Sequence, residues 1–171
     1  WSFTLANNNA VLQSLAVGQT ITQVYTVTLD DGHGGTVSQD VTITITGTND
    51  APVITSASGH HAGAVTEDQS VDGSGNVVAS DTITFRDLDL TDTHTASFVL
   101  KSSDATANLP GFAEGTGTGA ANIGTFAIDA SVTESNSDTD NTASLGWSFT
   151  LANNNAVLQS LAVGQTITQV Y

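Results

Sequence analysis

The residues with the clearest chemical capacity form a short acidic segment, Asp87-Leu88-Asp89-Leu90-Thr91-Asp92. On an extended backbone, Asp87 and Asp89 lie on the same side, about 6.5 Å apart, so two short carboxylates can converge on one ion. Leu88 and Leu90 would then face the core. Calcium takes about 6 to 8 oxygen ligands, and two aspartates alone do not supply them. Further oxygens therefore have to come from elsewhere in the chain.

The remaining candidate ligands lie around a joint, Gly47-Thr48-Asn49-Asp50-Ala51-Pro52, which separates two strongly alternating segments. Pro52 fixes its own φ and pushes Ala51 out of the helical region, so the joint is expected to be extended. Asn49 and Asp50 place side-chain oxygens at this joint. The sequence predicts a calcium site formed by Asn49, Asp50, Glu67, Asp87, Asp89 and Asp92, completed by backbone carbonyls and water.

An EF-hand loop and a solvated bend are two other interpretations of the acidic segment. It is not an EF-hand loop, because counting from Asp87 the sixth residue is Asp92 instead of glycine and the twelfth is Phe98 instead of glutamate. A solvated bend is the alternative, since aspartate is common in turns. Two further acidic segments are the turn at residues 30–35 and the loop at 131–141, which carries Glu134, Asp138 and Asp140. We interpret both as solvated loops in preference to ion sites.

Composition favours a cation as partner. The 171 residues include 17 acidic and two basic side chains, for a formal net charge of −15. Such a chain repels nucleic acid and anionic lipid, whereas divalent cations relieve its self-repulsion. Cysteine is absent, so a metal held by oxygen ligands would replace disulfides as the staple of a small secreted β-module. No segment has the apolar length of a membrane span.

The chain contains an internal repeat: residues 1–25 are identical to residues 147–171, with a period of 146 residues. That period suits a whole domain in a tandem array better than a solenoid unit. We expect residues 1–47 to be the C-terminal part of one module, 48–52 the inter-module joint, and 53–171 the next module. This second module lacks the counterpart of residues 26–47, its terminal hairpin.

Alternation of apolar and polar residues predicts mostly strands. It is strongest over 21–29 and 37–45, which the glycine-rich turn at 30–35 joins into a β-hairpin. Further strands are expected over residues 1–5, 53–54, 77–79, 83–85, 94–100, 123–128 and 145–151. Residues 12–17 could form one helical turn or a packed loop, and 102–121 a long connection. Short strands without a sustained helical period predict an all-β, antiparallel sandwich.

Four segments of the chain resemble the VCBS repeats of large RTX-type bacterial surface adhesins: residues 25–36, 41–52, 66–68 and 85–94, with the Gly-Thr-Asn-Asp-Ala-Pro joint as the most specific. The resemblance implies immunoglobulin-like or cadherin-like sandwich modules in tandem, with Ca²⁺ at the joints between neighbouring modules. It also implies an extracellular array on a Gram-negative bacterium, exported by type I secretion. The expected role is that of a calcium-stiffened extender that projects an adhesive tip for cell attachment or biofilm formation.

Two alternatives to a spacer remain open, and an enzyme is the weaker rival. The sequence has no Gly-x-Ser-x-Gly elbow and no cysteine, and aromatic residues make up only 6 % of it, few for a sugar-cleaving cleft. A module that binds carbohydrate or a host protein is the first alternative. The second is a strand-complemented extracellular filament, in which the N-terminal strands of one chain complete the C-terminal module of the next.

Overall fold

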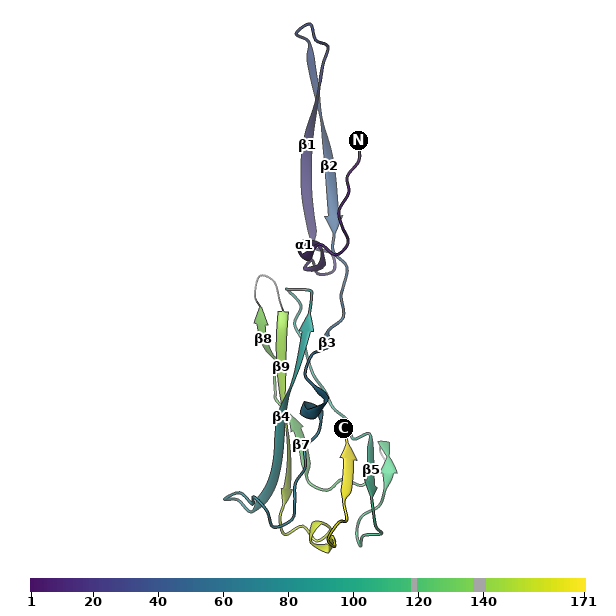
Figure 1. Ribbon diagram of the computed structural model, residues 1–171, viewed down its shortest axis with the longest axis vertical. Coiled ribbons are helices and arrows are strands. Elements are labelled where there is room, and N and C mark those ends of the chain that lie inside the picture. Colours follow the sequence, from purple (N-terminus) through teal and green to yellow (C-terminus); the bar gives the residue numbers. More distant parts are fainter. Residues whose placement is uncertain (118–119, 137–140) are drawn as a thin grey trace. The chain divides into compact units, whose positions relative to one another are not determined.

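The computed structural model describes residues 1–117, 120–136 and 141–171, and its described part is almost entirely antiparallel β-structure (Figure 1). This confirms the predicted all-β, sandwich-type class. Contacts divide the chain into two compact units. Unit 1 comprises Trp1–Val53, Arg86–Thr93 and Glu134–Ala143; unit 2 comprises Ile54–Phe85, His94–Thr133 and Ser144–Tyr171.

Unit 1 contains the predicted hairpin, which is confirmed. Strands β1 (Thr20–Asp30) and β2 (Thr36–Thr46) pair antiparallel along their whole length, from Thr20 opposite Thr46 to Asp30 opposite Thr36. The turn between them is closed by its own aspartates, because Asp31 Oδ1 accepts from the backbone N–H of His33 and Gly35 at 2.8 and 3.0 Å. Ahead of the hairpin lies the short helix α1 (Ala10–Gln13), which includes only residues 12 and 13 of the stretch 12–17; residues 14–17 are not helical.

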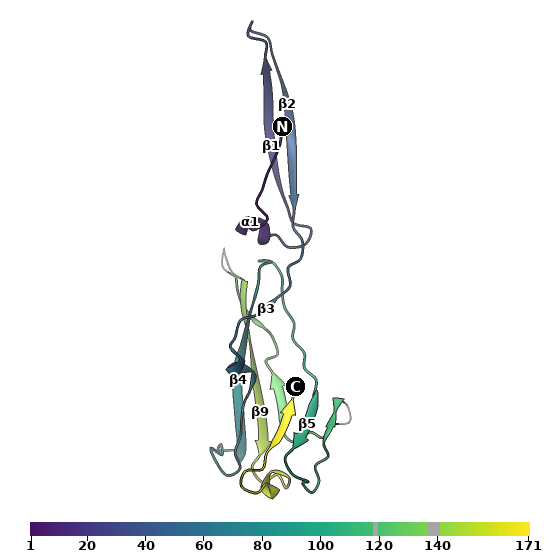
Figure 2. The same cartoon turned by 45° about the vertical axis from the view of Figure 1, so that its right-hand side comes forward.

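A larger sheet has the strand order β3-β4-β9-β7, with β8 also paired to β9. Its strands are β3 (Val53–Ile54), β4 (Asn76–Asp87), β7 (Thr125–Ile128), β8 (Thr133–Asn136) and β9 (Asn141–Ala152). The long strands β4 and β9 lie side by side (Figure 2) and contribute residues to both units. In β9, Trp147 lies opposite Ile128 and Phe149 opposite Phe126, so the apolar face of the sheet is continuous.

A second sheet, in unit 2, has the order β10-β5-β6, formed by β10 (Ile167–Val170), β5 (Ser102–Ala105) and β6 (Gly115–Thr116). Two 3-10 helices, η1 (Ser58–His61) and η3 (Leu158–Ser160), complete this unit. The core of unit 2 is Val77, Leu151 and Leu158. Beside it Trp147 stacks on Phe126 and donates its indole N–H to the carbonyl oxygen of His60 at 2.9 Å.

Several segments differ from the sequence prediction. Residues 94–100 alternate between apolar and polar side chains but form no strand among the described residues. Phe98 in this segment packs edge-to-face on Phe126 and Tyr171, so it has apolar contacts without a paired strand. The connection expected over 102–121 contains β5 and β6, and the loop expected over 131–141 contains β8. These short pairings depend on partners distant in sequence, which local alternation does not reveal.

Gly124 fixes the entry into β7, and we expect that Gly124→Ala destabilises unit 2 by about 2–4 kcal/mol. Its φ is +76°, and an added Cβ would lie 2.7 Å from Phe149 Cζ and 2.8 Å from the carbonyl oxygen of Thr150. Gly73→Ala is the matched control, because nothing lies within 4 Å of its Cβ position. Urea unfolding of both variants measures the difference; equal midpoints would contradict the prediction.

Candidate cation site

The acidic segment predicted to bind an ion forms a tight bend at the end of β4. Asp87, the last residue of β4, accepts the backbone N–H of Asp89 on its Oδ1 at 3.0 Å, and Asp92 N–H donates to the Asp89 carbonyl at 3.2 Å. These bonds curl the backbone, so the extended geometry assumed for the segment is wrong. Asp87 and Asp89 are 2 % and 0 % exposed. The leucines expected to face the core, Leu88 and Leu90, are only half-buried.

The joint is tied to this bend within unit 1. The backbone N–H of Asp50 donates to Asp89 Oδ2 at 2.8 Å, across 39 residues of sequence. Asn49 lies next to it and donates its side-chain amide to the Asp50 carbonyl at 2.8 Å. The carboxylate of Asp89 therefore holds the backbone of the joint directly.

Asn141, the first residue of β9, is a buried polar residue that the sequence prediction missed. It is 0 % exposed, and its Nδ2 donates to the carbonyls of Asp89 at 3.1 Å and Asp92 at 3.5 Å. The available signal was its position at the end of an acidic, Ser/Thr-rich loop, immediately before an alternating strand. A single asparagine at that position does not indicate that its side chain is buried.

Two buried oxygen atoms at this site, Asp89 Oδ1 and Asn141 Oδ1, have no hydrogen-bond partner among the described residues. Leaving such an acceptor buried and unpaired costs about 1–3 kcal/mol, and more when it is charged. Oxygen atoms of this kind are the ligands that calcium takes. The donor set therefore fits calcium in its chemistry.

The electrostatics at Asp89 are set by its burial and by acidic neighbours. Burial raises the pKa of Asp89, and the nearby carboxylates of Asp92, Asp87 and Asp50 raise it further, against the opposing hydrogen bond from the Asp50 N–H. Three acidic residues thus act on the charge of Asp89. A divalent cation would reverse this balance by favouring the ionised form.

The structure brings four of the six predicted ligands together, Asp50, Asp87, Asp89 and Asp92, with Asn49 adjacent to Asp50. Glu67 belongs to unit 2, and its membership of the site remains a prediction. Within the described part of the chain, no three acidic or histidine side chains already converge in metal-ligand geometry. Asp138 and Asp140, considered as a second cation site, lie outside the described residues.

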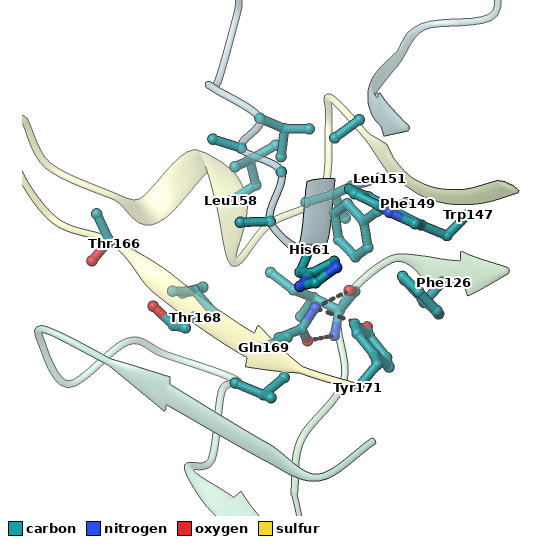
Figure 3. Close-up of a pocket in the computed structure, with 18 of the residues that line it drawn as sticks. His61, Phe126, Trp147, Phe149, Leu151, Leu158, Thr166, Thr168, Gln169 and Tyr171 are labelled. Carbon is teal, nitrogen blue, oxygen red and sulfur yellow. Dashed lines mark hydrogen bonds between the residues drawn. The ribbon is translucent and has the colours of Figure 1, made fainter. Parts of the chain in front are cut away.

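Unit 2 has a different feature, an apolar cavity of about 660 Å³ beside β10 (Figure 3). Phe126, Trp147 and Phe149 line it together with the residues of β10 and with Tyr171. The Gln169 side chain bridges to residue Ile123, donating to its carbonyl at 3.0 Å and accepting its N–H at 2.8 Å. The lining is thus largely apolar, with a few satisfied polar groups.

Comparison with protein-family models, curated proteins and solved structures finds no match to this chain. No helix in the described ranges is long and apolar enough to cross a membrane.

Proposed function

We propose that this chain is a calcium-stiffened spacer repeat of a secreted bacterial adhesin, without enzymatic activity. The observation that carries the proposal is the Asp89 carboxylate, which is fully buried beside the acidic residues Asp50, Asp87 and Asp92. One of its oxygens has no partner in the part of the chain that the structure describes. A buried carboxylate without a positive partner is costly in free energy, and a bound cation removes that cost. Asp89 accepts the N–H of Asp50, so an ion at this carboxylate would restrain residues 48–52.

The mechanical part of the proposal follows from the chain path. Asp50 is part of the joint, and its N–H already bonds Asp89 Oδ2. When bound, calcium supplies positive charge that holds the carboxylates of Asp50, Asp87 and Asp89 against one another. The joint then has fewer accessible backbone conformations, so a string of modules behaves as a rod. The 25-residue identity between residues 1–25 and 147–171 supports a tandem array, as does the resemblance of the joint to VCBS repeats.

Calorimetric titration with calcium tests this function. We expect one or more saturable binding events that weaken at least about tenfold in Asp87→Ala and in Asp50→Ala, since each removes a charged ligand. Asp104→Ala is the control, because Asp104 is exposed and its Oδ1 accepts only from the following N–H, that of Ala105, at 3.0 Å. Absence of calcium binding to the unmodified chain would refute the proposal.

A further inference from the structure

Asn141 is a fully buried amide that lies against the Asp89 bend within unit 1. Its Nδ2 donates to the backbone carbonyl oxygens of Asp89 and Asp92, at 3.1 and 3.5 Å, across 52 and 49 residues of sequence. Because Asn141 begins β9, these bonds tie the start of that strand to the bend. The amide therefore contacts two residues that are themselves proposed calcium ligands.

The same two bonds decide which way the Asn141 amide faces. One end of the group, Nδ2, donates hydrogen bonds, and the other, Oδ1, accepts them, so the partners determine the orientation. If the amide were flipped, Oδ1 would meet the carbonyl oxygens of Asp89 and Asp92, and no proton would lie between the acceptors. The donating end thus belongs on the bend, which leaves Oδ1 for a different partner.

That partner is not supplied by residues 1–117, 120–136 and 141–171. Asn141 Oδ1 accepts no hydrogen bond from them, and neither does Asp89 Oδ1, although both atoms are buried. Buried acceptors in folded proteins nearly always have a partner, so each exception points to a bound water or ion. Asn141 and Asp89 are also joined directly by the 3.1 Å hydrogen bond, so the two unpaired oxygens belong to residues in contact.

The charge around this pair favours a cation over a water molecule. Asp89 has the carboxylates of Asp50, Asp87 and Asp92 near its own, and these neighbours act on it in the same direction as its burial. A water molecule can donate to an unpaired oxygen but leaves that negative charge unbalanced. Calcium balances it, and its ligands in proteins include asparagine side-chain oxygens as well as carboxylates.

We propose that Asn141 supplies its Oδ1 as a neutral ligand to the calcium ion at Asp89, an assignment that rests on the proposed function. The ion would then be shared by three segments distant in sequence: the joint through Asp50, the bend through Asp87 and Asp89, and the start of β9 through Asn141. Asparagine adds an oxygen to the site without adding another buried charge, which would have to be desolvated.

The alternative role for Asn141 is positioning alone, in which Nδ2 holds the bend and a buried water satisfies Oδ1. Both roles predict weaker calcium binding when Asn141 is replaced by alanine, so the affinity of that variant does not separate them. The number of water molecules on the bound ion does separate them. Only the loss of a ligand oxygen leaves a coordination position that water must fill.

Europium(III) is the probe, because it occupies calcium sites and its luminescence lifetimes in H₂O and D₂O report the number of coordinated waters. We expect Asn141→Ala to raise that number by about one relative to the unmodified chain. Asn154→Ala, at an exposed asparagine just after β9, is the control and should leave it unchanged. An unchanged number in Asn141→Ala overturns the ligand role of Asn141.

Asn141→Asp provides a second measurement that remains decisive if the alanine variant does not fold. It keeps an oxygen in place of Oδ1 but removes the Nδ2 donor. A ligand role predicts that the calcium dissociation constant does not rise, because a charged oxygen replaces a neutral one. A rise of about tenfold or more would mean that Nδ2 carries the effect, and it overturns the proposal.

The unmodified chain distinguishes failure of this assignment from failure of the calcium site. If it binds neither calcium nor europium, the site and the role of Asn141 are refuted together. If it binds both ions and the Asn141 variants give the contrary results, only the role of Asn141 is refuted.

Discussion

Calcium is expected to raise the melting temperature of this chain by about 5–10 °C at concentrations near one hundred times its dissociation constant. The value follows from linkage: such an excess stabilises the folded state by about 2.7 kcal/mol, and each kcal/mol shifts the melting temperature by about 2–4 °C at this chain length. Excess EDTA should reverse the shift. Differential scanning calorimetry with and without EDTA measures it, and identical traces would count against a calcium site.

Asp89→Asn distinguishes the contribution of the Asp89 charge to ion binding from the contribution of its hydrogen bond to the fold. The asparagine oxygen can still accept the Asp50 N–H that bonds Asp89 Oδ2 in the native chain, but the buried charge is gone. Without calcium, the variant should melt higher than the unmodified chain, because its carboxylate is no longer buried among Asp50, Asp87 and Asp92. With calcium, the variant should show no further rise. Asp104→Asn, at an exposed position, should retain the full response.

The same carboxylate predicts a pH dependence. The pKa of Asp89 is raised in the folded chain by burial and by its acidic neighbours. Between the unfolded and folded pKa values the folded state binds more protons, so this group's contribution to the stability of the calcium-free protein falls as pH rises through the folded pKa. Calcium binds the ionised form, so its effect on the melting temperature should grow over the same interval. Melting curves across mildly acidic pH, with and without calcium, test both signs.

Trp147→Ala should cost about 3–5 kcal/mol of unfolding free energy, whereas Trp1→Ala should change it by no more than about 0.5 kcal/mol. The two tryptophans have the same following 24 residues in sequence. Trp147 is 8 % exposed, stacks on Phe126 and bonds the His60 carbonyl, while Trp1 is 88 % exposed. The sequence that follows each tryptophan therefore does not contribute to the difference between the two unfolding free energies.

Urea unfolding at a protein concentration where the chain is monomeric gives both values. A large loss for Trp1→Ala under these conditions would mean that Trp1 packs in the monomer. A small loss for Trp147→Ala would mean that the aromatic row in unit 2 contributes little to stability.

Much of the fold was predictable because the strands alternate so regularly. The hairpin β1–β2 followed from its period and its glycine-rich turn. The acidic residues of the candidate site were recognisable by type and spacing. Asn141 was not, because its burial depends on β9 beginning beside the Asp89 bend. The short strands β5, β6 and β8 were missed for the same reason, since distant partners create them.

The repeat shows directly what sequence determines by itself. Asn9 Oδ1 accepts the N–H of Val11 and Leu12 at 3.0 and 3.2 Å, and in the second copy Asn155 Oδ1 accepts those of Val157 and Leu158 at the same distances. Two glutamine contacts and a serine contact are also duplicated: Gln13 and Gln159 to the carbonyls of Asn7 and Asn153, Gln19 and Gln165 to the N–H of Ala16 and Ala162, and Ser14 and Ser160 to the carbonyls of Val11 and Val157. These bonds join residues at most six positions apart, so they form wherever the sequence occurs.

The structural differences between the two copies of the repeat come from tertiary structure. Trp147 to Ala152 continue β9 because β7 lies beside them, whereas the identical Trp1 to Ala6 form no strand. Leu151 is 3 % exposed and Leu5 is 36 % exposed. The physical reason is that a strand's hydrogen bonds and the burial of its side chains both require a neighbour, and no local sequence can supply one.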